Sequence, residues 1–201
     1  MIVVVLGMHR SGTSAITRSL QTLGVRLGGR LMEPAANNEK GFYEDLDLVA
    51  LNEEMLQTIE RQWDSLEPLQ EVDIDLLCSK GYLLRAVSLL REKLGDDPAF
   101  GFKDPRTARL LPFWQRVFAS TDINVRYVMA YRNPLSIIRS LERRDGFDSA
   151  KSFLLTADYL LACLSLAQDK PLLLVDYDGL MSEPQVELER LSEYLSMPLD
   201  E

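Results

Sequence analysis

The 201-residue sequence contains only one histidine and two cysteines. Cys78 and Cys163 stand alone in apolar, helix-like stretches, without the paired spacing of a zinc site or a disulfide framework. Isolated thiols in such surroundings are typical of small core residues in a reduced compartment. We therefore expect no disulfide, no metal site and a cytoplasmic location.

Positive charge and long apolar runs are also scarce. The sequence has 22 Lys and Arg against 31 Asp and Glu, a formal net charge of -9, which argues against a nucleic-acid partner because phosphate backbones are held by clustered Lys and Arg. The apolar run at 2–6 is too short for a membrane span and lacks the basic flank and cleavage site of a signal peptide. We expect no membrane span and a single domain over 1–201.

Strand and helix patterns alternate along the chain. Apolar runs predict strands at 2–6, 99–103, 124–131 and 171–175. Apolar residues at helical spacing predict helices over 15–20, 46–61, 72–94, 106–118, 134–141, 151–168 and 186–195, and a loop is expected over 33–45. This alternation predicts an α/β fold of three layers, with a parallel sheet of about four or five strands and helices on both faces.

The first predicted strand runs directly into a glycine-containing loop and then a helix. Gly7 and Gly12 allow the backbone to approach an anion closely, and the helix offers its free N-terminal N–H groups. The frame matches the phosphate loop (P-loop) of nucleoside triphosphatases at both glycines and at Ser14, but Thr13 stands where that loop has its lysine. A triphosphate normally needs the lysine with magnesium, whereas a less charged sulfuryl group can be held by hydroxyls, amides and one arginine, here Arg10.

Two motifs resemble the sulfotransferases that use 3′-phosphoadenosine 5′-phosphosulfate (PAPS). The run Arg10-Ser11-Gly12-Thr13-Ser14 is similar to their 5′-phosphosulfate loop. Arg132 ends a predicted strand and Ser140 follows eight positions later on roughly the same helix face, the spacing of the family's 3′-phosphate pair. The resemblance implies a P-loop fold and PAPS as the cofactor, bound by these seven residues.

A third motif, Lys103-Asp104-Pro105, resembles the tyrosylprotein-type sulfotransferases, whose lysine faces the transferring group. Cytosolic members of the family use a catalytic histidine well beyond the loop, but the only histidine here is His9, within the loop, so another base is needed. By analogy with a glutamate of the tyrosylprotein type we choose Glu44. Arg10, Glu44 and Lys103 are thus the expected catalytic residues, with Asp45 and Asp64 as rival bases.

Other functions remain open at this point. The apolar run at 172–175 followed by Asp176 is typical of a magnesium-binding strand, which would indicate a metal-dependent nucleotide kinase or triphosphatase, although Thr13 counts against it. A non-catalytic nucleotide-binding module is a third possibility. For a sulfotransferase, the acceptor would be a hydroxyl or amine of a small molecule, carbohydrate or peptide. The family's C-terminal segment rich in Arg, Lys and Gly has no match here, which indicates either a minimal type or a truncated domain.

Overall fold

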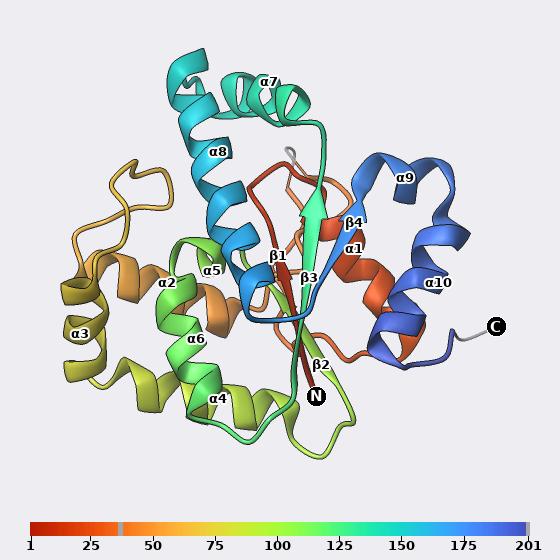
Figure 1. Ribbon diagram of the computed structural model, residues 1–201, viewed down its shortest axis with the longest axis horizontal. Helices are drawn as coiled ribbons and strands as arrows, with labels where there is room; N and C mark the ends of the chain where they lie inside the picture. Colours follow the sequence, from red (N-terminus) through yellow and green to blue (C-terminus); the bar gives the residue numbers. More distant parts are fainter. Residues whose placement is uncertain (36–37, 200–201) are drawn as a thin grey trace.

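A computed structural model describes residues 1–35 and 38–199, and its centre is a parallel sheet (Figure 1). Four strands lie in the order β2-β1-β3-β4, with bounds β1 (Ile2–Leu6), β2 (Phe100–Lys103), β3 (Val125–Tyr131) and β4 (Leu172–Asp176). Val4 of β1 pairs with Phe102 on one side and Tyr127 on the other. The predicted parallel sheet of about four or five strands is confirmed, with four strands.

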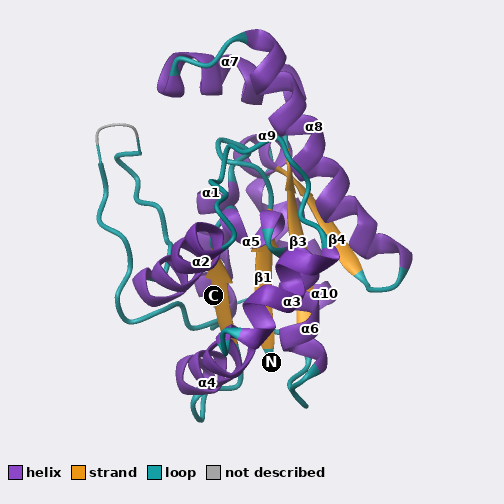
Figure 2. Ribbon diagram, turned by 90° about the vertical axis from the view of Figure 1, so that its left-hand side faces the viewer, coloured by secondary structure: helices purple, strands orange, loops and turns teal. Residues whose placement is uncertain are grey.

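Helices cover both faces of the sheet (Figures 1 and 2). One face is covered by α1 (Thr13–Ser19), the 3₁₀ helix η1 (Leu20–Leu23), α9 (Tyr177–Ser182) and α10 (Pro184–Leu195). The other face is covered by α2 (Leu46–Thr58), α3 (Glu71–Ser79), α4 (Tyr82–Leu94), α5 (Arg106–Arg109), α6 (Leu111–Ala119) and α8 (Ser149–Ser165), which η2 (Leu166–Gln168) extends. The chain therefore has the three-layer, P-loop-like α/β architecture expected from its sequence.

The internal position of β1 explains its uninterrupted apolar run. Val3 and Val5 point into the core beneath α1, whereas Val4 and Leu6 point into the core beneath the larger helical layer. All five residues of β1 are at most 1% exposed. A strand that is buried on both faces has no solvent-facing side, so its sequence does not alternate between apolar and polar residues.

Two helices predicted as continuous are each divided in the structure, so those predictions were wrong. The segment 72–94 forms α3 and α4, separated at Gly81, whose φ of +83° is a left-handed conformation outside the helix. The segment 106–118 forms α5 and α6, separated at Leu110. Pro112 follows this break, and its ring lacks an N–H group and would collide with a preceding helical carbonyl, so a new helix begins there.

The helix α7 (Pro134–Asp145) follows β3 and packs against α8, extending past the carboxyl ends of the strands (Figure 2). Asn133 caps it by accepting a hydrogen bond from the backbone N–H of Leu135 at 3.0 Å. No helix in the described ranges is long and apolar enough to cross a membrane. Both cysteines are free thiols, and burial raises the pKa of Cys163 to about 12.

Candidate active site

The loop between β1 and α1 is shaped by glycine and by internal hydrogen bonds. Gly12 has a φ of +93°, and a Cβ atom placed on it would lie 2.1 Å from Cδ2 of Tyr177, so only glycine fits there. The Ser11 hydroxyl donates to the carbonyl oxygen of Met8 at 2.7 Å. Thr13 and Ser14 open α1, so their N–H groups have no acceptor within the helix. The loop therefore presents a helix N-terminus suited to an anion.

This helix N-terminus faces a cavity of about 470 Å³ at the carboxyl edge of the sheet. The predicted residues Gly12, Thr13 and Ser14 line it, together with Glu44 and Lys103. Its lining carries seven cationic side chains, namely Arg10, Arg18, Lys40, Lys103, Arg106, Arg132 and Arg144. Glu44 is the one carboxylate among the described lining residues. In a chain of net charge -9, such a concentration of positive charge indicates an anionic ligand.

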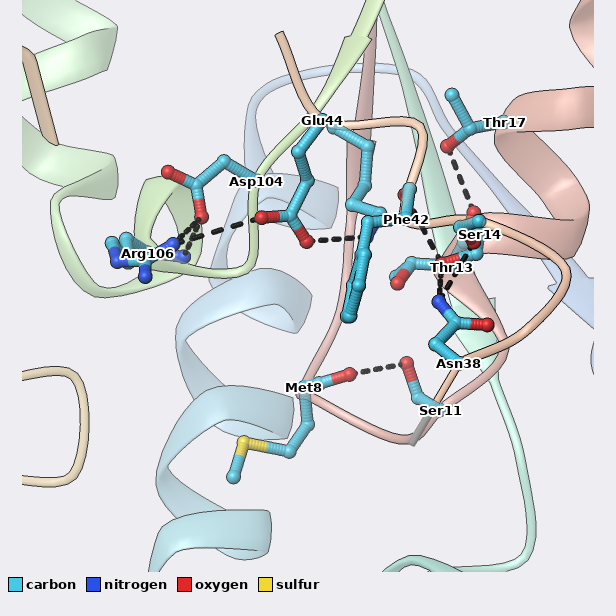
Figure 3. A network of polar contacts seen from close by, with 12 residues as sticks. Met8, Ser11, Thr13, Ser14, Thr17, Asn38, Phe42, Glu44, Asp104 and Arg106 are labelled. Carbon is cyan, nitrogen blue, oxygen red and sulfur yellow. Dashed lines mark hydrogen bonds and ion pairs between the residues drawn. The ribbon is translucent and has the colours of Figure 1, made fainter. Parts of the chain in front are cut away.

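Glu44 and Lys103 form a buried ion pair within this cavity. Lys103 Nζ donates to Glu44 Oε1 at 2.6 Å, and the two residues are 3% and 5% exposed. Arg106 reaches both neighbouring carboxylates, with Nη1 at 2.9 Å from Asp104 Oδ1 and 3.7 Å from Glu44 Oε2 (Figure 3). Burial raises the pKa of Glu44 above its ordinary value, although Lys103 opposes this shift.

The segment that carries Glu44 is fastened to the loop through Ser14. The Ser14 hydroxyl donates to the carbonyl oxygen of Phe42 at 3.1 Å, and Asn38 Nδ2 lies 3.4 Å from the same hydroxyl (Figure 3). Asn38 Nδ2 also donates to the carbonyl oxygen of Gly41 at 2.7 Å. The start of α1 and residues 38–44 thus form two walls of one cavity.

The predicted pair Arg132 and Ser140 lies on a second cavity of about 540 Å³, at the base of α7. Arg10 lines both cavities, and its Nε donates to the Ser140 hydroxyl at 2.8 Å. Arg132 Nη1 donates to the carbonyl oxygen of Arg10 at 2.9 Å, and its guanidinium lies 4.7 Å from the centre of the Tyr177 ring. The structure therefore brings together two motifs separated by more than 120 residues.

Several predicted residues do not reach the first cavity, at the N-terminus of α1. Ser11 is buried beneath the loop and does not line it. Asp45 caps α2 by accepting from the N–H groups of residues 47 and 48, and it also pairs with Lys93 at 2.8 Å. Asp64 pairs with Lys151 at 2.6 Å. Asp176 caps α9 through its own carboxylate. Among the acids considered as bases, only Glu44 lines the cavity within the described part of the chain.

The structure adds cavity residues to which the sequence gave no role. His9 lines the first cavity, and its ring centre lies 4.4 Å from that of Trp63. Burial and the cations Arg144, Arg106, Lys103 and Arg10 hold the pKa of His9 well below its ordinary value, so its imidazole is neutral at pH 7. The position of His9 inside the phosphate loop was a signal for this site. Arg144 and Tyr177 had no such signal, because they enter from distant helices.

No family model matches this chain, and no curated protein matches it in sequence. Solved structures do match its fold. The sulfotransferase domain from the curacin biosynthetic pathway is 20% identical with a TM-score of 0.62, covering 99% of this chain and 75% of that domain. The sulfotransferase domain of the Synechococcus PCC 7002 olefin synthase is 17% identical with a TM-score of 0.60, covering 99% and 74%.

The fold is also similar to a nucleoside kinase. Deoxyadenosine kinase from M. mycoides, solved with bound dATP, is 12% identical with a TM-score of 0.52, covering 98% of this chain and all of that one. At these identities the comparisons establish the P-loop-like fold alone. None of these similarities bears on the tyrosylprotein-type detail expected from Lys103-Asp104-Pro105.

Proposed function

We propose that the chain is a single-domain sulfotransferase that moves a sulfuryl group from PAPS to a hydroxyl or amine of an acceptor. One observation carries the proposal: two adjoining cationic cavities share Arg10 and Arg132, and one lies at the N-terminus of α1 and the other at Ser140 of α7. PAPS carries a phosphosulfate at its 5′ end and a phosphate at its 3′ end. Two separated anion sites match a nucleotide charged at both ends better than a 5′-triphosphate.

The side chains present fit such a ligand. Arg132 Nε is buried and has no acceptor among the described residues, and an anionic oxygen would supply one. Gly12 lines the first cavity and also allows the Tyr177 ring to pack against the loop, where any larger residue would collide with that ring. Arg10, Gly12, Thr13 and Ser14 would hold the nucleotide at the loop, and Arg132 with Ser140 would hold its 3′-phosphate. Ser11 would support the loop through its bond to Met8.

In the proposed reaction Glu44 removes the proton from the acceptor hydroxyl or amine as the acceptor oxygen or nitrogen bonds to sulfur. The bond between sulfur and the bridging phosphate oxygen breaks, and adenosine 3′,5′-bisphosphate leaves. Lys103 stabilises the charge that develops on the transferring group and the leaving oxygen, with Arg106 nearby. The protein mainly positions the reactants and supplies fixed charges. The acceptor is a small molecule, a carbohydrate or a peptide.

Similarity to the two sulfotransferase domains supports this reading, whereas the kinase-like fold alone supports nucleotide binding. In a kinase or triphosphatase the Asp176 carboxylate would bind magnesium. Here that carboxylate accepts a hydrogen bond from the N–H of Asp178 at the start of α9. Thr13 in place of the lysine also counts against a triphosphate.

Ligand-dependent thermal unfolding tests the proposal. Adenosine 3′,5′-bisphosphate at a hundredfold excess over its dissociation constant should stabilise the fold by about 2.7 kcal/mol, and ATP with magnesium should do much less. The opposite order would overturn the proposal in favour of a nucleotide kinase or triphosphatase. Release of the bisphosphate from PAPS, followed across a panel of phenols, sugars and amines, separates an enzyme from a module that only binds.

A further inference from the structure

Arg10 adopts an uncommon backbone conformation, and its side chain makes a hydrogen bond with α7. Its φ is +70°, a left-handed value that non-glycine residues rarely take and that costs free energy. In this conformation Nε donates to Ser140 at 2.8 Å, while the carbonyl oxygen accepts from Arg132 at 2.9 Å. Both contacts join the loop to the segment that begins α7. They favour a role for Arg10 at the second cavity.

The second cavity holds cations close together. It is lined by Arg10, Arg132, Ser136, Arg139, Ser140, Glu142 and Arg143. Burial lowers the pKa of Arg10, and the neighbouring charges of Arg144 and Arg132 lower it further because like charges repel. Glu142, the one carboxylate among the described lining residues, accepts a hydrogen bond from Ser149 at 2.5 Å. An anion bound between the arginines would relieve this repulsion.

Arg132 is held with one donor unused. The Tyr177 ring lies against its guanidinium and Nη1 is bound to the Arg10 carbonyl, whereas Nε is buried without an acceptor in the described structure. Arg10 Nε donates to the Ser140 hydroxyl, and all three residues line the second cavity. The three side chains thus converge on one place from the loop, the end of β3 and α7.

On the basis of the proposed function, we infer that Arg10 binds the 3′-phosphate of the nucleotide together with Arg132 and Ser140, and is not a ligand of the sulfuryl group. Arg10 then determines selectivity for nucleotides that carry a 3′-phosphate. The charge at the reacting end is then stabilised by Lys103, the hydroxyl of Thr13 and the N–H groups that open α1. Occupation of the 3′-phosphate site also holds the loop in its left-handed turn.

Calorimetric titration with two nucleotides tests this assignment. Arg10→Ala should weaken binding of adenosine 3′,5′-bisphosphate by about 10- to 100-fold, the usual effect of losing a charged hydrogen bond. Adenosine 5′-phosphate, which lacks the 3′ group, should lose less than about threefold. Arg132→Ala shows how much affinity for adenosine 3′,5′-bisphosphate is lost when a residue that binds the 3′-phosphate is removed. Arg18→Ala is the matched control, because Arg18 lines the first cavity but not the second one and should show no selectivity.

A second variant separates the loss of the Arg10 guanidinium from any loss of the folded loop. Glycine adopts a φ of +70° without strain, so Arg10→Gly keeps the turn while removing the guanidinium. It should show the same selective loss as Arg10→Ala. An equal loss of affinity for both nucleotides in both variants would overturn the inference and return Arg10 to the 5′ end. Wild-type protein that binds the two nucleotides equally would instead contradict the proposed function itself.

Discussion

Lys103 Nζ lies 2.6 Å from Glu44 Oε1, and this pair joins the end of β2 to a loop that precedes α2. Both side chains are nearly withdrawn from water, so each ion depends on the other for compensation. An acceptor that displaces Lys103 toward the transferring group would leave Glu44 with a stronger tendency to take a proton. The ion pair thus couples the two residues that we propose as catalytic.

Replacing Glu44 tests its proposed role as the base. Glu44→Gln keeps an oxygen near Lys103 but cannot take a proton, and it should lower turnover about a hundredfold or more. Affinity for adenosine 3′,5′-bisphosphate should stay unchanged, because the nucleotide is held by other residues. Steady-state kinetics and titration of the same preparation separate the two effects.

Asp64→Asn is the matched control for that variant. Asp64 pairs with Lys151 outside the first cavity, so its loss should leave turnover within about twofold. Normal turnover in Glu44→Gln together with a large loss in Asp64→Asn would transfer the role of base to Asp64.

The raised pKa of Glu44 predicts how turnover depends on pH. Burial raises its pKa above 4.5, and a base must be ionised to act. Turnover should therefore fall on the acid side at a pH above the ordinary range of a glutamate. A rate that stays constant down to pH 4.5 would exclude Glu44 as the base.

The same shift affects stability with a defined sign. A raised pKa in the folded state means that folding favours the protonated carboxyl, so this contribution is full below the pKa of the unfolded chain. It is lost as the pH rises through the pKa of the folded state. Glu44→Gln should remove this component from the pH dependence of the free energy of unfolding.

Gly12→Ala should disturb the loop by two separate effects. A left-handed backbone costs an alanine about 1 kcal/mol or more, and the new Cβ would also meet the Tyr177 ring at 2.1 Å. Gly24→Ala is the matched control, since Gly24 has a φ of +71° and open space around it. Urea unfolding should show the larger loss for Gly12→Ala, and equal losses would refute the contact with Tyr177.

The Asp45–Lys93 ion pair should contribute to the free energy of unfolding and not to catalysis. Lys93 Nζ lies 2.8 Å from Asp45, and their side chains are only 9% and 1% exposed. Lys93→Met should lower the free energy of unfolding by about 3 kcal/mol, because it leaves a buried carboxylate without its cation. Arg85→Ala, which breaks an exposed pair with Glu54, should cost less than about 1 kcal/mol. A small loss in Lys93→Met would show that Asp45 is compensated by its helix cap alone.

Local patterns in the sequence predicted the elements that have local causes. The run of β-branched residues in β1 and the glycines of the loop each act within a few residues. The breaks at Gly81 and Leu110 were missed because apolar residues continue at helical spacing through both. For these segments the backbone conformation of single residues overrode the hydrophobic pattern.

The site was predictable by residue type but not by arrangement. Glu44 and Lys103 were chosen separately, and nothing in the sequence showed that 59 residues of chain would fold back to pair them. The contact of Arg10 with Ser140 depends on a left-handed backbone angle, which an arginine does not signal. Arg144 comes from the far end of α7, and its approach to His9 depends on how the helices pack.

The two tryptophans of the sequence occupy contrasting environments. Trp114 is fully buried, donates its indole N–H to Asn52 Oδ1 at 2.9 Å and lines neither cavity. Trp63 lies against His9 and beneath Arg144, whose guanidinium is 5.3 Å from its ring centre. Intrinsic fluorescence therefore contains one emitter beside the cavity and one fixed internal reference. In a Trp114→Phe variant, emission from Trp63 alone would follow the filling of the cavity in real time.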